Sequence, residues 1–267
     1  MKKIIYLLLI LVIVSCQKED TNAIPGYIKI DVITLDEENI TSNITDAWVY
    51  VNDQLQGVYE LPAEFPILES GTQTLRIKAG IKANGIASTR IPYPFYGSYF
   101  EDVTFTPNQS QTINPTVNYL DSIQYFLEDF EGNGMDLDTD SLNFSVESFE
   151  GNKYGKITLD SIYLVAEITT DELTDLPQAG APIFLELDYK CNTQFLVGVY
   201  INYPQSVVQK DLLWINPKED WNKIYLNLTS TISEGINATS FKVFIGIKRN
   251  TELDKNELYF DNLKVVY

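Results

Sequence analysis

The chain has 267 residues, with 37 acidic and 19 basic side chains and a formal net charge of −18. A chain this acidic is not attracted to nucleic acid or to an anionic membrane surface. It contains no histidine, which excludes imidazole metal ligands and the serine and cysteine triads that use a histidine base. Only carboxylate chemistry is then open to an enzyme.

Residues 1–15 have the organisation of a secretion signal. Lys2 and Lys3 are followed by an unbroken apolar run at 4–14. The run is too short to cross a bilayer, which needs roughly twenty residues, but it suits a signal peptide. The segment Ile13-Val14-Ser15-Cys16 after it resembles the lipobox of bacterial lipoproteins. That resemblance implies cleavage before Cys16 and attachment of lipid to it.

A short tether is expected at 16–23. Its residues Lys18, Glu19 and Asp20 resemble the export signal of Bacteroidetes surface lipoproteins. The resemblance implies an outer-membrane protein that faces outward and is held by two or three acyl chains, palmitate among them. The alternative is a solvated tether without a targeting role. With Cys16 lipidated, no disulfide within the chain is possible, and Cys191 is expected to be a small buried residue.

Strand patterns dominate the rest of the chain. Apolar and polar residues alternate with a period of two, as half-buried strands require, at 28–32, 75–79, 224–228 and 241–247. Short helical turns are expected only at 171–174 and 229–234. Many short strands at regular spacing predict an all-β protein of two antiparallel β-sandwich domains, at 24–119 and 120–267.

The first domain shows a strand that runs into a turn at 47–53, Gly57, a strand with a proline at 65–68, and an alternating strand after Gly71. Over 44–81 this order resembles the PEGA and carboxypeptidase-regulatory-like sandwiches of surface proteins. Those families act as spacers and presentation modules. Trp48 would then lie in the core, as a tryptophan in a strand usually does.

An aromatic segment follows at 93–100. If Tyr93 and Tyr96 are exposed, they can stack on sugar faces or dock on a partner protein. The alternative is that they fill the space between sheets.

The second domain opens with Glu128-Asp129-Phe130-Glu131-Gly132 and closes with a strand at 257–265. Together with the strand that begins at Trp221, these segments resemble jelly-roll, galactose-binding-like modules. Many such modules bind carbohydrate and others are structural. Trp214 is the candidate for stacking on a sugar, whereas Trp221 starts an alternating strand and is expected in the core.

Two calcium sites are candidates. The jelly-roll resemblance implies a structural Ca²⁺ between Glu131 and Asp261, with the alternative that Asp261 caps a β-bulge. Separately, a loop has the acidic spacing of an EF-hand, although Ser141 stands where that pattern has glycine. The ligands of this loop site would be Asp136, Asp138, Asp140 and Glu147. The alternative is a solvated acidic loop that binds no metal.

Three Asp-Ser-aliphatic segments resemble the O-glycosylation signal of Bacteroidetes. Ser122 and Ser141 are the preferred acceptors, and Ser161 is expected to be less accessible. The alternative is that each Asp-Ser pair makes turn hydrogen bonds. Catalysis is not expected, because Glu186 and Asp188 share a strand face but lack the third acid of jelly-roll glycosidases.

The sequence therefore predicts a non-catalytic surface lipoprotein whose distal domain binds a glycan. The rival hypothesis is a structural or assembly lipoprotein that binds a protein of the cell envelope. An exposed Trp or Tyr platform on a sheet would favour the glycan. A flat apolar patch at 93–100 would favour the protein partner.

Overall fold

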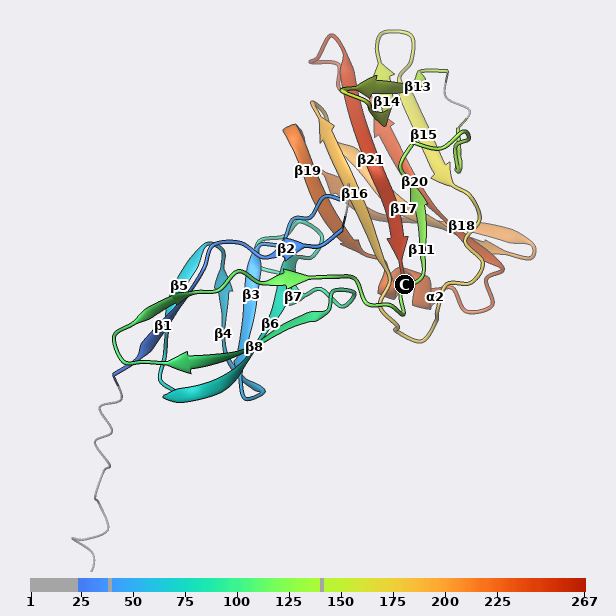
Figure 1. Cartoon of the computed structure of the whole chain (residues 1–267). Helices are drawn as coiled ribbons and strands as arrows, with labels where there is room; N and C mark the ends of the chain where they lie inside the picture. Colours follow the sequence, from blue (N-terminus) through green and yellow to red (C-terminus); the bar gives the residue numbers. More distant parts are fainter. Residues whose placement is uncertain (1–23, 38–39, 140–141) are drawn as a thin grey trace, which may run out of the picture.

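The computed structural model describes residues 24–37, 40–139 and 142–267. The described chain is all-β apart from one short helix, and its strands build two sandwiches that lie side by side (Figure 1). Cys16, Lys18, Glu19 and Asp20 lie outside the described residues, as do Asp140 and Ser141. The predicted fold class is confirmed.

The first sandwich uses ten strands. One sheet has the order β4-β3-β6-β7, with β8 also on β6, and smaller sheets are formed by β5-β1-β9 and β10-β2. Two pairings, β1 with β9 and β2 with β10, are parallel, which is a local departure from the predicted antiparallel pairing. The strands are β1 (Gly26–Ile30), β2 (Thr34–Leu35), β3 (Asp46–Val51), β4 (Gln54–Glu60), β5 (Ala63–Ile67), β6 (Gly71–Lys82), β7 (Arg90–Pro92), β8 (Ser98–Phe105), β9 (Ser110–Thr112) and β10 (Thr116–Val117).

The second sandwich consists of two sheets, which we name after their central strands. The β21 sheet has the order β13-β14-β21-β16-β19, with β11 also on β21, and the β20 sheet has the order β12-β15-β20-β17-β18. The strands are β11 (Tyr125–Glu128), β12 (Leu137–Asp138), β13 (Phe144–Phe149), β14 (Asn152–Leu159), β15 (Val165–Thr170), β16 (Phe184–Cys191), β17 (Phe195–Tyr203), β18 (Ser206–Ile215), β19 (Lys218–Asn227), β20 (Ser240–Lys248) and β21 (Asn256–Val266).

The helix α2 (Thr229–Glu234) lies where the sequence predicts a helical turn. The turn predicted at 171–174 is wrong, because Leu173 instead forms a β-bridge with Phe241. No helix within the described ranges is long and apolar enough to cross a membrane.

The two sandwiches share a buried junction. In β16, Leu185 and Leu187 face the core of the second sandwich, and Phe184 points to the opposite face because side chains alternate along a strand. That opposite face is covered by the first sandwich. Its Phe184, Tyr225 and Val266 side chains pack into the same hydrophobic cluster as the core of the first sandwich. One half of the β21 sheet is therefore buried on both faces.

Two tryptophan predictions are wrong and the cysteine prediction is confirmed. Trp48 is half-buried on the face of β3 opposite the core residues Ala47 and Val49. Trp221 is 42% exposed on edge strand β19. Cys191 is buried, and burial raises the pKa of its thiol. Period-two alternation identifies each strand, but it does not say which of its two faces meets the core.

Candidate functional site

Trp214 lies on the outer face of the β20 sheet and is 51% exposed. It is the cross-strand partner of Leu196 in β17, which in turn is paired with Gly246 in β20. Gly246 is paired with Glu167 in β15. Directly paired residues of neighbouring strands point to the same side of a sheet, so these four positions form one row across the outer face.

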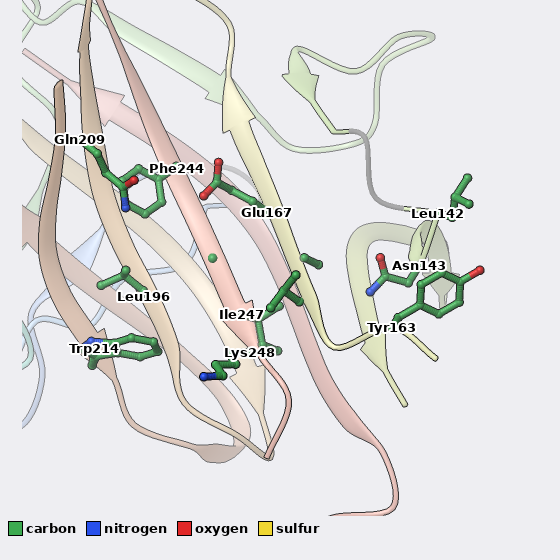
Figure 2. Close-up of a pocket in the computed structure, with 13 residues that line it drawn as sticks. Leu142, Asn143, Tyr163, Glu167, Leu196, Gln209, Trp214, Phe244, Ile247 and Lys248 are labelled. Atoms are coloured by element: carbon green, nitrogen blue, oxygen red, sulfur yellow. The ribbon is translucent and has the colours of Figure 1, made fainter. Parts of the chain in front are cut away.

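Gly246 leaves a gap in that row. A Cβ at this position would lie 3.9 Å from Glu167 Oε2 and 4.0 Å from Phe244, which is ordinary contact with no crowding. Because Gly246 has no side chain, its backbone forms part of the floor of a hollow of about 490 Å³. We call it the Trp214 hollow. Figure 2 shows Trp214 and Tyr163 at opposite sides of it.

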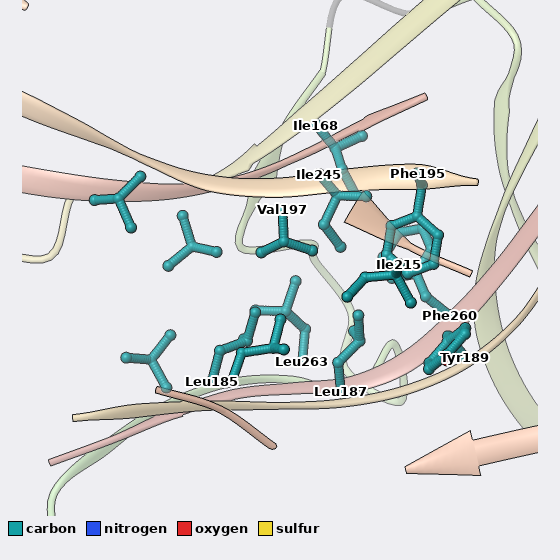
Figure 3. Packing of buried hydrophobic residues seen from close by; sticks show 14 of the residues in the cluster. Ile168, Leu185, Leu187, Tyr189, Phe195, Val197, Ile215, Ile245, Phe260 and Leu263 are labelled. Carbon is teal, nitrogen blue, oxygen red and sulfur yellow. The ribbon is translucent and has the colours of Figure 1, made fainter. Parts of the chain in front are cut away.

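The opposite face of the same strands is filled by the core. Phe195, Val197 and Ile245 are buried there between the two sheets (Figure 3). The packing of the sandwich therefore does not require an aromatic ring at Trp214, on the other side of the β20 sheet.

Polar groups line the rim of the Trp214 hollow. They come from Asn143, Glu167, Gln209 and Lys248. The Tyr200 hydroxyl donates a 2.9 Å hydrogen bond to Glu167 Oε1. Burial and the neighbouring Glu167 raise the pKa of Tyr200 to about 12, so the hydroxyl remains a donor at neutral pH and holds the carboxylate in place. The hollow thus combines an apolar floor and an aromatic wall with hydrogen-bonding groups at its edge.

A second hollow, of about 660 Å³, lies where the first sandwich meets the outer face of the β21 sheet. We call it the junction groove. Trp221, Tyr154 and Phe149 line one part of it, and Asp188 and Asp261 line another. Thr41 and Ser42 of the first sandwich line it as well, and so do the charged side chains of Glu150 and Lys223.

Asp188 and Asp261 are cross-strand partners in β16 and β21. Asp188 Oδ2 accepts hydrogen bonds from the Thr41 hydroxyl at 2.5 Å and from Asn262 Nδ2 at 2.9 Å. Asp261 Oδ2 accepts one from Asn152 Nδ2 at 3.0 Å. Burial raises the pKa of Asp261 to about 6, and the nearby carboxylates add to the effect. The groove therefore has a floor rich in hydrogen-bond acceptors.

A β-bulge places Asp261. The register of β16 and β21 shifts between Glu186 and Asp188, and Asn262 has a φ of 48°. The Asn262 backbone N–H donates to Asp261 Oδ1 at 2.7 Å. Asp261 therefore caps this bulge.

The calcium candidates are distributed as follows. Glu131 accepts a hydrogen bond from the Lys153 backbone N–H at 2.6 Å. Asp138 is paired with Lys242 at 2.6 Å, and Glu147 lies 3.3 Å from Lys156 on the neighbouring strand. Asp136 is exposed, and its backbone N–H donates to Glu128. Within the described ranges, no group of three or more acidic or thiol side chains is placed to hold a metal ion. Calcium binding stays a prediction.

Tyr93 and Tyr96 do not form an exposed platform, so their predicted role in ligand binding is wrong. They are 3% and 6% exposed, between the sandwiches. Tyr93 donates to Glu186 Oε1 at 2.6 Å, and the Tyr96 hydroxyl lies 3.0 Å from that of Tyr225. The second sandwich supplies the apolar surface that covers these rings, which no local pattern around 93–100 reveals.

The proposed glycosylation sites differ from expectation in one respect. Ser122 is exposed in a turn, and Ser161 is exposed as well, although it was expected to be less accessible. Asp160 makes the anticipated turn bonds, since its carboxylate accepts from the Ile162 and Tyr163 backbone N–H groups. Those two bonds lower the pKa of Asp160.

No protein-family model matches the sequence, and no curated protein matches it. Among solved structures, a family 29 carbohydrate-binding module is similar, with 11% identity and a TM-score of 0.35 over 54% of this chain and 85% of the module. A family 30 module of a cellulosomal cellulase of Clostridium thermocellum has 16% identity and a TM-score of 0.37, over 53% of this chain and 90% of the module. At these similarities no ligand or residue role carries over to this chain.

The sequence interpretation missed the floor of the Trp214 hollow, and it did not bring the residues of the junction groove together. Gly246 interrupts an apolar strand pattern, and an isolated glycine in a strand often marks a place that another group approaches closely. That signal was available. The sequence contains no comparable signal for the junction groove, because Thr41 and Asp188 lie far apart in the chain.

Proposed function

We propose that this protein is a non-catalytic, lipid-anchored surface protein whose second sandwich binds a glycan in the Trp214 hollow. The observation that carries the proposal is the exposed indole of Trp214 beside the gap at Gly246. A sugar ring has an apolar face of C–H groups that stacks on an aromatic ring, and hydroxyls at its edge that need polar partners. The hollow offers both.

The non-catalytic part of the proposal rests on the acids in the hollow. Glycoside hydrolysis needs a pair of carboxyl groups on either side of the scissile bond. Among the described residues that line the Trp214 hollow, Glu167 is the only acidic one, and Tyr200 holds it. A bound glycan should therefore be recovered with its length unchanged.

The anchor belongs to the same proposal. Cys16 would carry the lipid, and Lys18, Glu19 and Asp20 would direct the protein to the outer face of the outer membrane. In this arrangement the first sandwich separates the membrane from the glycan site. The excess of acidic side chains suits a protein that must not adhere to the cell surface that carries it.

A glycan-array screen with the full-length protein identifies the ligand, and two variants test the site. Trp214→Ala removes the aromatic wall and should weaken binding at least about tenfold, or about 1.4 kcal/mol. Gly246→Val puts a side chain into the floor without backbone strain and should weaken binding similarly.

The matched control is Phe100→Ala, which removes an exposed aromatic ring from the first sandwich and should leave binding unchanged. If Trp214→Ala and Gly246→Val both bind the glycan as tightly as the wild-type protein does, the glycan binds elsewhere and the proposal is wrong.

A protein partner is the second candidate. Leu142, Ile162 and Val165 are exposed, and Leu142 and Val165 line the Trp214 hollow. Such a group of apolar side chains is typical of a docking surface. This alternative would be favoured if no glycan on the array binds and if Leu142→Asp abolishes binding of a protein of the cell envelope.

A further inference from the structure

We infer that the junction groove is a second saccharide site, completed by the first sandwich, that accepts neutral sugar chains and rejects anionic ones. The inference shares its class of ligand with the proposed function. It rests on different residues, so either can fail without the other.

The groove has an aromatic wall in which the Trp221 and Phe149 side chains are open to solvent. Trp221 and Tyr154 meet edge to face, with ring centroids 5.8 Å apart. The Lys190 ammonium lies 5.4 Å from the Trp221 ring and 4.5 Å from that of Tyr259. Phe149 is exposed at the end of β13. Three aromatic side chains beside one hollow provide stacking surfaces for consecutive sugar rings.

The floor of the groove is built to accept hydrogen bonds. Asp188 and Asp261 are each 5% exposed, so both carboxyl groups are held in place by their surroundings. Sugar hydroxyls donate hydrogen bonds, and the two oxygens of an ionised carboxylate can accept one each from two neighbouring hydroxyls. Asn152 and Asn262 already donate to these carboxylates and keep them oriented. An oriented acceptor loses little entropy when a ligand binds.

The charge on this floor is only partly compensated. Lys223 lies 3.9 Å from Asp188, but it is closer to Glu186, at 3.3 Å. Among the described residues, the hydrogen bonds to Asp261 come from an amide side chain and a backbone N–H. A uronate or sulfate group placed on this floor would meet like charges in a partly buried setting, which is costly. Neutral sugars do not incur that cost.

The first sandwich is part of the site. The Thr41 hydroxyl donates to Asp188 at 2.5 Å. The same segment is attached to β19, because the Asn43 backbone N–H donates to the Tyr225 hydroxyl and Asn43 Nδ2 donates to the Lys223 carbonyl. The wall formed by Thr41 and Ser42 therefore has a defined position relative to the floor.

Indole N–H signals provide a direct test, because the chain has only three tryptophans. In ¹⁵N-labelled full-length protein in detergent, Trp214 reports on one hollow, Trp221 on the groove, and half-buried Trp48 serves as an internal reference. Single Trp→Phe variants assign the three signals. The probes are cello-, manno- and xylo-oligosaccharides, with an oligogalacturonate of equal length as the anionic probe.

The expected result is that at least one neutral oligosaccharide shifts the Trp221 signal and leaves Trp48 unchanged. The oligogalacturonate should bind the groove at least about tenfold more weakly. Thr41→Ala should weaken binding at the groove, whereas Trp214→Ala should not.

Asp188→Asn with Asp261→Asn should reduce the preference for neutral over anionic chains. A Trp221 signal that no neutral oligosaccharide shifts overturns the inference, as does equal binding of the anionic probe. A shift of Trp214 alone would support the proposed function and refute the second site.

Discussion

Asp261 is a buried carboxyl group whose surroundings favour its protonated form. Its pKa rises from the reference value of 3.8 to about 6 in the folded protein, chiefly because burial disfavours the charge. Protonation of Asp261 therefore stabilises the folded state. That contribution is complete below about pH 4 and is lost as the pH rises through 6.

Asp261→Asn should remove this pH dependence. Relative to the variant, the wild-type protein should lose about 1–3 kcal/mol of unfolding free energy between pH 4 and pH 7, since one pKa unit corresponds to about 1.4 kcal/mol. Urea denaturation across this range measures the difference. Asp160→Asn is the control, because the lowered pKa of Asp160 predicts the opposite trend, with stability lost as the pH falls. A constant difference for Asp261→Asn would contradict the prediction.

At the scale of elements, the segment from Tyr93 to Tyr119 joins the sandwiches through one buried carboxylate. Glu186 accepts hydrogen bonds from Tyr93 at 2.6 Å and from Tyr119 at 2.8 Å, and lies 3.3 Å from Lys223. Burial raises the pKa of both tyrosines, so their hydroxyls remain donors. Every polar group in this cluster has a partner, which is the condition under which a buried charge is tolerated.

Removal of partners from this cluster should be costly. Tyr93→Phe should lower the unfolding free energy by about 1.5–3 kcal/mol, the usual value of a hydrogen bond to a charged group. Glu186→Ala should cost about 3–5 kcal/mol, because it removes the nearer carboxylate partner of buried Lys223. Tyr99→Phe is the control, since its hydroxyl bonds to Glu101 at the surface, and it should cost less. Equal losses for Tyr93→Phe and Tyr99→Phe in chemical denaturation would count against the junction as a stabilising unit.

At the scale of the whole molecule, the proposed lipid anchor would hold the two proposed glycan sites at the outer membrane. Cys16→Ser should release the protein from membranes and abolish labelling by a lipid precursor, because the Cys16 thiol is the proposed point of lipid attachment. Replacement of Lys18, Glu19 and Asp20 by Ala should leave it membrane-bound but protected from external protease. Membrane fractionation and proteolysis of intact cells measure the two effects. Unchanged fractionation of Cys16→Ser would refute the anchor.

The sequence by itself determined the all-β class and the position of α2. The all-β class follows from a local signal, strand alternation with a period of two. It also singled out Trp214, which the structure places on an open sheet face. The burial of Cys191 followed from its apolar neighbours in the chain.

The tertiary structure decided which faces of those strands are covered. Tyr93 and Tyr96 are buried because the β21 sheet lies over them, whereas Trp221 is exposed on edge strand β19 of the same sheet. The junction groove exists because Thr41 and Asp188 meet across the two sandwiches. Alternation assigns side chains to two faces of a strand, but which face meets solvent depends on residues far away in the chain.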